Sequence, residues 1–179
     1  MRFLVVLGTA REGRNSVYPA EKVVEEFEEG GHETCLYDLG EKDVPPLGNR
    51  TYRDEGPVPE DIQELSREVE RSDGVVLVVP EYNHYFPGVL KTALDYLYPE
   101  YDDKPFSFVT VSAGGFGGVR ALNHLHDIVL ALGGFVGPDL QVSRVGDVFS
   151  SDGELVDDDY RERFSGFVEE TEKFVRKVS

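Results

Sequence analysis

Residues 8–16, GTAREGRNS, have the composition of an anion-binding loop. They directly follow an apolar run and open a segment with helical spacing of apolar residues. Their hydrogen-bond donors are Thr9, Arg11, Arg14, Asn15 and Ser16. Backbone N–H groups at a helix N-terminus bind phosphate, and guanidinium groups reinforce that binding, so a phosphomonoester would suit this loop. A second interpretation is that Ser16 only caps the helix and the arginines are solvated. The loop alone does not separate the two.

Two nucleotide-binding motifs are close to this loop without matching it. Gly8 and Gly13 are in register with GxxxxGK[ST], but Arg14 replaces the lysine and Asn15 replaces the hydroxyl residue that binds magnesium. No apolar strand segment ends in the acidic residue that would complete a magnesium site. The fingerprint GxGxxG is also missing after the first apolar run. We therefore expect neither a P-loop NTPase nor a dinucleotide-binding fold.

A second candidate segment, residues 80–95, reads PEYNHYFPGVLKTALD. Tyr82, Tyr85 and Phe86 could flank a planar ring while backbone groups pair with its polar edge. The alternative is that these aromatic side chains close the core at the end of the sheet. His84 has no second histidine or cysteine at ligand spacing, so we expect no metal site.

The third candidate segment, residues 112–118, reads SAGGFGG. Glycine permits close approach of the backbone to a ligand and turns with positive φ. No Ser-His-Asp or Cys-His arrangement can be proposed from spacing, and the GxSxG elbow of serine hydrolases is missing. A bound cofactor must therefore carry any chemistry, and no side chain is expected to be catalytic.

The apolar pattern alternates between strands and helices. Strands are predicted over 3–7, 33–39, 75–79, 106–111 and within 140–145, and helices over 20–27, 62–69, 89–97, 122–132 and 160–178. This α/β alternation predicts one domain, residues 1–179, with a five-stranded parallel sheet between two helical layers: a flavodoxin-like three-layer sandwich of order 2-1-3-4-5. Ligands in such sheets bind beyond the carboxyl ends of the strands, where the three candidate segments must converge. The connection 40–58 is too long for a plain linker, and could be a lid or a partner-binding loop.

The charge narrows the classes of partner. The 35 Asp and Glu outnumber the 18 Lys and Arg, for a formal net charge of −17. This balance argues against binding to nucleic acids and to anionic membranes, and suits a protein kept soluble at high salt. No apolar run approaches the ~20 residues of a membrane span, and Cys35 alone permits no intrachain disulfide. We expect a soluble cytoplasmic protein whose three candidate loops, nearly free of acids, are the exception to its acidity.

Together and in this order, the three segments resemble the NADPH-dependent FMN reductase family, flavodoxin-like proteins that include quinone, azo-dye and chromate reductases. The resemblance implies non-covalent FMN. The residues implied to hold its phosphate are Thr9, Arg11, Arg14, Asn15, Ser16 and Val17. Those implied to contact the isoalloxazine and ribityl region, largely through backbone, are Pro80, Glu81, Tyr82, Asn83 and His84. Those implied to line the remaining edge are Ser112, Gly114, Gly115 and Gly118.

The resemblance also implies an activity: electrons pass from NAD(P)H through the flavin to a small acceptor such as a quinone, flavin, azo compound or metal oxyanion, by a ping-pong hydride mechanism. A homodimer or homotetramer with the flavin near a subunit interface is implied as well. The alternative is a flavodoxin-type electron carrier that docks a protein redox partner. Tyr85 and Phe86 make the middle loop bulkier than is common in the family, which bears on the acceptor. Arg120 could meet the 2′-phosphate of NADPH or pair with nearby acids.

Overall fold

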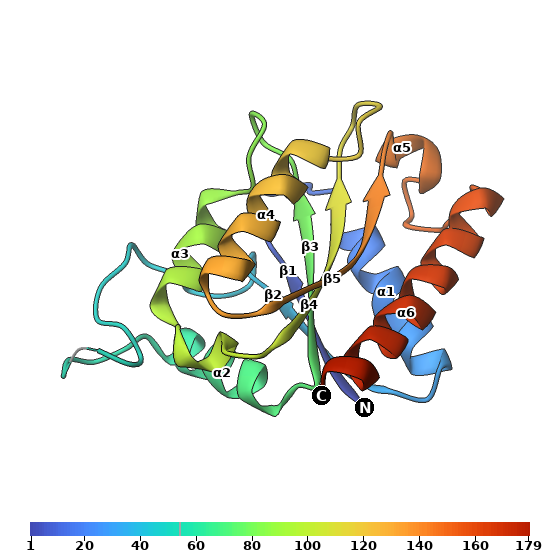
Figure 1. Ribbon diagram of the computed structural model, residues 1–179. Helices are drawn as coiled ribbons and strands as arrows, with labels where there is room; N and C mark the ends of the chain where they lie inside the picture. The colour runs from blue at the N-terminus through green and yellow to red at the C-terminus, as the bar shows by residue number, and fades with distance from the viewer. Residues whose placement is uncertain (54) are drawn as a thin grey trace.

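The computed structural model describes residues 1–53 and 55–179, and its centre is a five-stranded parallel sheet. The strands are β1 (Arg2–Leu7), β2 (Glu33–Asp38), β3 (Gly74–Pro80), β4 (Pro105–Val111) and β5 (Phe135–Val142). Their order is β2-β1-β3-β4-β5, so the predicted sheet topology is confirmed (Figure 1).

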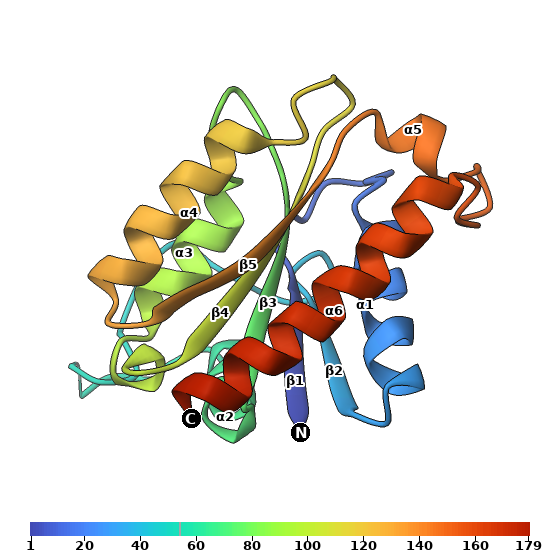
Figure 2. The ribbon, with the colours of Figure 1, turned by 45° about the vertical axis from the view of Figure 1, so that its right-hand side comes forward.

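Helices cover both faces of this sheet (Figure 2). One face carries α1 (Val17–Glu29) and α6 (Asp158–Val178), and the other carries α2 (Glu60–Arg71), α3 (Gly88–Tyr96) and α4 (Val119–Ala131). Two short elements, the 3-10 helix η1 (Pro99–Tyr101) and α5 (Val145–Val148), lie in connections. The predicted three-layer sandwich is therefore present.

Side-chain alternation along the strands divides the core into two halves. On β1, Phe3 and Val5 pack toward α1 and α6, whereas Leu4 and Val6 pack toward α2, α3 and α4. Every residue of β3 and β4 is buried, because both strands lie inside the sheet with helices on each side. This double burial explains why β3 is a continuous apolar run and why the only polar residues of β4 are the small Ser107 and Thr110.

The fifth strand differs from its prediction: it spans Phe135–Val142 and ends before residues 143–145. Its early part contains Gly137 and Pro138, which argue against an internal strand. At the edge of the sheet they are accommodated by a register shift between Phe106 and Phe108 of β4. Phe174 of α6 crosses so close to Gly137 that a Cβ atom there would lie 2.4 Å from its ring.

The connection 40–58 forms neither helix nor strand among its described residues. Tyr96, at the end of α3, holds part of it: its hydroxyl accepts from the Gly48 amide at 3.1 Å and donates to the Pro46 carbonyl at 2.9 Å. The Thr51 amide donates to the Tyr96 carbonyl at 3.0 Å. The connection thus packs against the end of α3, and its role as a lid or partner-binding loop stays a prediction.

Candidate functional site

The loops that follow β1, β3 and β4 meet at one edge of the sheet, the upper edge in Figure 1. Together they line a cleft of about 250 Å³. The lining residues are Arg11, Gly13, Arg14, Asn15, Ser16, Pro80, Glu81, Tyr82, Val111, Ser112 and Ala113. The cleft lies where the strand order reverses between β1 and β3, the position at which open α/β sheets bind ligands.

Ser16 supplies an unpaired donor to this cleft. It occupies the N-cap position of α1, yet its side chain caps no backbone amide. The residue is 2% exposed, and its Oγ has no hydrogen-bond partner among the described residues. A buried hydroxyl without a partner costs free energy, which an acceptor oxygen of a ligand would remove. Ser16 therefore fits a phosphate at the start of α1 better than it fits a helix cap.

Arg14 lines the same cleft, but its guanidinium is already engaged. It forms an ion pair with Asp38 at the end of β2, and both side chains are largely buried. Gly40 leaves room for it, because a Cβ atom there would lie 2.7 Å from the guanidinium carbon. In this arrangement Arg14 ties the loop after β1 to the end of β2, while its buried Nε has no partner among the described residues.

A hydrogen bond joins the first two loops. Thr9, which is buried, shares a 2.9 Å bond between its Oγ1 and the hydroxyl of Tyr82. Tyr82 and Tyr85 exchange backbone bonds of 2.9 and 3.0 Å, which closes a two-residue turn. Asn83 and His84 form the tip of that turn, with φ of 50° and 68°. Both side chains are exposed, so the turn offers its backbone and these two polar groups at the rim of the site.

Glu81 connects the second loop to the third. Its carboxylate accepts hydrogen bonds from the backbone amides of Arg120 and Ala121 at 3.1 and 3.3 Å. These amides belong to the first turn of α4, where a negative charge is favourable. The Glu81 side chain is 13% exposed and therefore acts as a cap for α4, supplied from the end of β3. This leaves the backbone of Glu81 as the part that faces the cleft.

The glycine-rich loop after β4 has two sharply constrained positions. Gly117 and Gly118 have φ of 60° and 79°, and a Cβ atom on Gly118 would lie 2.9 Å from the Cβ of Thr110. The hydroxyl of Ser112 donates to the Gly114 carbonyl at 2.9 Å, which folds the start of the loop. Gly114 has open space where a side chain would be.

The structure brings eight of the fifteen predicted site residues to the cleft. They are Arg11, Arg14, Asn15, Ser16, Pro80, Glu81, Tyr82 and Ser112. The others do not line it: Thr9 is buried beneath, Val17 begins α1, Asn83 and His84 form the turn tip, and Gly114, Gly115 and Gly118 lie along the third loop. Val17, Asn83 and Gly114 directly adjoin lining residues in the chain, and Thr9 is hydrogen-bonded to the lining residue Tyr82.

Sequence reasoning missed Arg144, which lies between β5 and α5. Its amide donates to the Gly114 carbonyl at 2.9 Å, so this connection is attached to the glycine-rich loop. The preceding residue, Ser143, donates its amide to the Tyr160 hydroxyl at 3.0 Å. Burial opposes ionisation of that phenol, but the Ser143 bonds and the charge of Arg163 lower the pKa of Tyr160 below its usual value. The only signal for Arg144 in the sequence was its position near the end of the fifth strand, and that strand was predicted too late in the chain.

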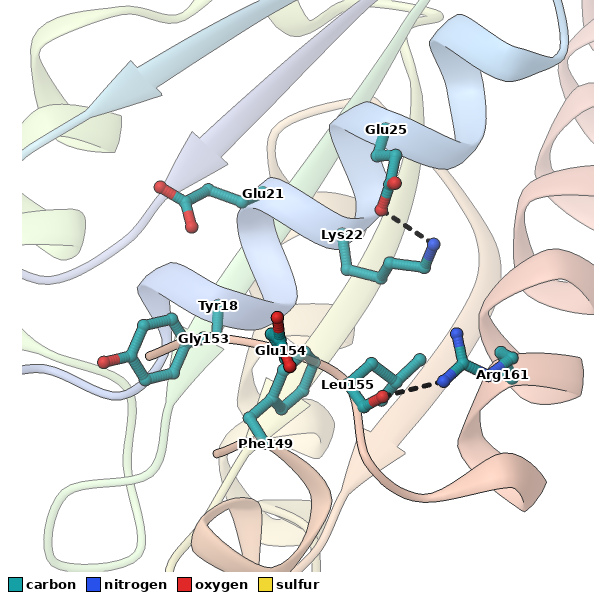
Figure 3. Close-up of a pocket in the computed structure, with 9 residues that line it drawn as sticks. All are labelled: Tyr18, Glu21, Lys22, Glu25, Phe149, Gly153, Glu154, Leu155 and Arg161. Carbon is teal, nitrogen blue, oxygen red and sulfur yellow. Dashed lines mark hydrogen bonds and ion pairs between the residues drawn. The ribbon is translucent and has the colours of Figure 1, made fainter. Parts of the chain in front are cut away.

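A larger hollow, of about 510 Å³, lies away from the three loops, between α1 and the start of α6 (Figure 3). Its two cationic groups already have partners: Lys22 pairs with Glu25 at 2.8 Å, and Arg161 donates to the Leu155 carbonyl at 2.8 Å. It contains none of the predicted site residues. The smaller cleft, with its unpaired buried hydroxyl, is therefore the stronger candidate site.

The groups that line the cleft suit an anionic, planar ligand. No group of three or more His, Cys, Asp or Glu side chains in the described ranges could hold a metal ion. The donors at the start of α1 suit a phosphate, and the neighbouring turn offers backbone groups and an aromatic side chain. Within the same ranges, no helix has the length and apolar character needed to cross a membrane.

Comparison with known proteins identifies the family of this chain. A model of the NADPH-dependent FMN reductase family matches residues 1–147. The chain is 37% identical to an NADPH azoreductase of Bacillus sp. (strain OY1-2) over 128 residues, or 70% of this chain and 67% of the relative. It is also 37% identical to a quinone reductase of Escherichia coli (strain K12) over 98 residues, which is 52% of each chain.

Among solved structures, the fold is similar to that of FerB from Paracoccus denitrificans, described as a flavoenzyme NAD(P)H:(acceptor) oxidoreductase. The TM-score is 0.82 and the identity 25%, over 98% of this chain and 97% of that one. Because the family match spans more than half of the sequence and all three candidate loops, the chain belongs to the NADPH-dependent FMN reductase family.

Proposed function

We propose that this protein is an oxidoreductase that binds FMN non-covalently in the cleft and passes electrons from NAD(P)H to a small acceptor. The observation that supports this most directly is the buried, unpaired hydroxyl of Ser16 at the start of α1, inside a loop of donors. Such a loop matches a phosphomonoester, which is the anchoring group of FMN. The family match and the names of its relatives support the same cofactor and the same electron donor.

Each part of the cleft has a role in this proposal. Ser16, Asn15, Arg11 and the amides of the first turn of α1 would bind the phosphate. Tyr82 and the backbone of the 82–85 turn would hold the ring system at its rim, and Ser112 would lie along its other edge. The flavin supplies the hydride chemistry when bound, so no side chain is needed as a nucleophile.

We further propose that donor and acceptor use this cleft in turn, as a ping-pong mechanism requires. The relatives reduce azo compounds and quinones by name, which favours planar acceptors. The rings of Tyr85 and Phe86 pack at a tilt, with centroids 4.5 Å apart, beside the turn. This bulk would narrow the space over the ring and favour flat aromatic acceptors over large ones.

The first test is a visible absorption spectrum. Purified protein is incubated with FMN, passed through gel filtration and scanned for bound flavin; a colourless protein would contradict the proposal. The loaded protein is then given NAD(P)H and a soluble quinone without any protein partner. Rapid oxidation of NAD(P)H supports an enzyme, whereas bound flavin without turnover supports the alternative, an electron carrier of the flavodoxin type.

The protein is also proposed to form a homodimer or homotetramer. Val119 and Leu130 on α4 and Tyr85 on the adjacent turn are 39%, 63% and 44% exposed, which leaves large apolar side chains on one side of the molecule. A second copy covering this surface would bury them, and the end of the surface formed by Val119 and Tyr85 adjoins the loops of the site. Light scattering after size exclusion gives the mass, and a monomer at every concentration would contradict this proposal.

A further inference from the structure

Two arginines from other elements contact the glycine-rich loop after β4. Arg144 packs on Gly115, where a Cβ atom would lie 3.2 Å from the guanidinium. Arg120, in the first turn of α4, lies over Phe116 with its guanidinium carbon 5.4 Å from the ring centroid. The two arginines therefore contact adjacent residues of one exposed loop, next to the cleft.

Neither arginine has a strong acidic partner. Arg144 is exposed, and no carboxylate in the described part of the chain forms an ion pair with it. Arg120 is about half exposed and reaches Glu81 only at 4.0 Å. The other oxygen of that carboxylate already accepts from two amides of α4. In a chain with 35 acidic residues, two incompletely paired arginines that both contact this loop favour the binding of an external anion there.

The backbone holds Arg144 in this position despite an unfavourable conformation. Its φ is 47°, in the left-handed region where glycine or asparagine is favoured. The bond from its amide to Gly114 and the 3.1 Å bond from Val145 to the Ser112 carbonyl keep it there. Strain of this kind is retained where the surrounding structure imposes it, and it is frequent at ligand sites.

Phe116, on which Arg120 packs, is 70% exposed. Arg120 covers part of its ring, and the rest faces solvent. An exposed aromatic ring beside guanidinium groups suits a purine nucleotide, whose base can stack while its phosphates pair with the arginines. NAD(P)H has such groups, because the ribose that carries its adenine also carries the diphosphate and, in NADPH, the 2′-phosphate.

We propose that the glycine-rich loop binds the adenosine half of NAD(P)H, with Arg144 pairing with the diphosphate and Arg120 with the 2′-phosphate of NADPH. Arg144 is assigned to the diphosphate because its amide bonds to Gly114 and that of the next residue, Val145, bonds to Ser112, at the cleft end of the loop. Phe116 stacks on the adenine. This inference rests on the proposed function, since it places the electron donor of that reaction, and it makes Arg120 the residue that favours NADPH over NADH.

Three variants test the assignment. Arg144→Asn removes the charge while keeping a residue that tolerates positive φ, and Arg144→Lys restores the charge. Arg120→Gln removes the second guanidinium. Arg71→Gln is the matched control, since Arg71 is an exposed arginine at the end of α2, by the amino ends of the strands. For each protein, KM for NADPH and NADH is measured with FMN-loaded enzyme, and the Kd of 2′,5′-ADP by calorimetry.

Loss of one charge-assisted pair corresponds to about a tenfold change in affinity or more. Arg144→Asn should raise KM about tenfold for both NADPH and NADH, and Arg144→Lys should recover most of that loss. Arg120→Gln should raise KM for NADPH and the Kd of 2′,5′-ADP about tenfold, with KM for NADH within roughly twofold. Arg71→Gln should resemble the unmodified protein.

The two proposals fail separately. If the unmodified protein retains FMN and oxidises NADPH while both loop variants stay within roughly twofold of it, the adenosine site is wrong and the reductase assignment stands. If Arg120→Gln weakens NADPH and NADH equally, its assignment to the 2′-phosphate is wrong. The 2′,5′-ADP titration needs no flavin, so it tests the loop even if FMN is not retained; no binding by the unmodified protein would overturn the inference.

Discussion

At the scale of single residues, Ser16 and Arg14 show which features of the site could be predicted from sequence and which could not. The sequence identified a loop of donors, but left open whether Ser16 is a helix cap or a ligand. Its hydroxyl caps nothing and is buried without a partner. The pairing of Arg14 with Asp38 could not be foreseen, because the two residues are 24 positions apart and meet only through the pairing of β1 with β2.

Because the Ser16 hydroxyl is buried without a partner among the described residues, removing it should affect stability and FMN affinity in opposite directions. Ser16→Ala removes a buried, unpaired hydroxyl, so the stability of the FMN-free protein should stay the same or rise by about 1 kcal/mol. FMN affinity should fall about tenfold or more, because a hydrogen bond to the phosphate is lost. Chemical denaturation and FMN titration measure the two effects.

Ser72→Ala is the matched control for that variant. Ser72 is also buried, but its hydroxyl donates to the Val69 carbonyl at 2.9 Å at the end of α2. This change should lower stability and leave FMN affinity as it was. If Ser16→Ala instead destabilises the FMN-free protein by about 1 kcal/mol, as loss of an N-cap does, Ser16 is a cap after all.

At the scale of elements, the sequence predicted the three inner strands β1, β3 and β4 well, because they are buried and mostly apolar. The edge strand β5 was placed too late, since Gly137 and Pro138 resemble a turn and are tolerated only at an edge with a register shift. That error also hid Arg144, whose position beside the glycine-rich loop follows from the strand that ends just before it. The start of α4 could not be predicted from its own segment either, because the carboxylate that caps it belongs to Glu81 on another loop.

This cap across two loops predicts a stability effect that the sequence does not suggest. Glu81→Ala should lower the free energy of unfolding of the FMN-free protein by about 1 kcal/mol, since two amides of α4 lose their acceptor and the helix loses a favourable charge. Glu81→Gln should lose less, because an amide oxygen can still accept. Urea denaturation measures both variants.

Asp157→Ala calibrates that result. Asp157 caps α6 within its own segment, accepting from the Asp159 amide at 2.9 Å and the Tyr160 amide at 3.3 Å. Asp157→Ala should lower the free energy of unfolding by an amount similar to that expected for Glu81→Ala. If Asp157→Ala lowers the free energy of unfolding but Glu81→Ala leaves it equal to that of the unmodified protein, the hydrogen bonds between Glu81 and α4 contribute nothing to stability.

At the scale of the whole molecule, the net charge of −17 contrasts with the loops of the site, which contain few acidic residues. Acidic residues on the helices repel one another, while Arg11, Arg14, Arg120 and Arg144 lie near the carboxyl ends of the strands. At the other end of the sheet, Arg2 pairs with Glu68. Burial alone would raise the pKa of Glu68, but its hydrogen bond and ion pair with Arg2 lower it. The stabilisation by this pair is therefore present above the ordinary pKa of glutamate and is lost as pH falls through the lowered, folded-state pKa.

Self-repulsion of this size predicts that salt stabilises the protein at pH 7. Raising NaCl from about 0.1 M to about 1 M shortens the Debye length from about 10 Å to about 3 Å, so the acidic surface is screened. We expect the melting temperature to rise by roughly 2–4 °C, equivalent to about 1 kcal/mol for a chain of this length. Near pH 4.5, the sequence pI, net repulsion is small, while the pair of Arg2 with Glu68 persists because of its lowered pKa. The salt-induced rise should therefore largely disappear there. An equal rise at both pH values would show that NaCl acts through general burial of apolar surface rather than through the charge of the molecule.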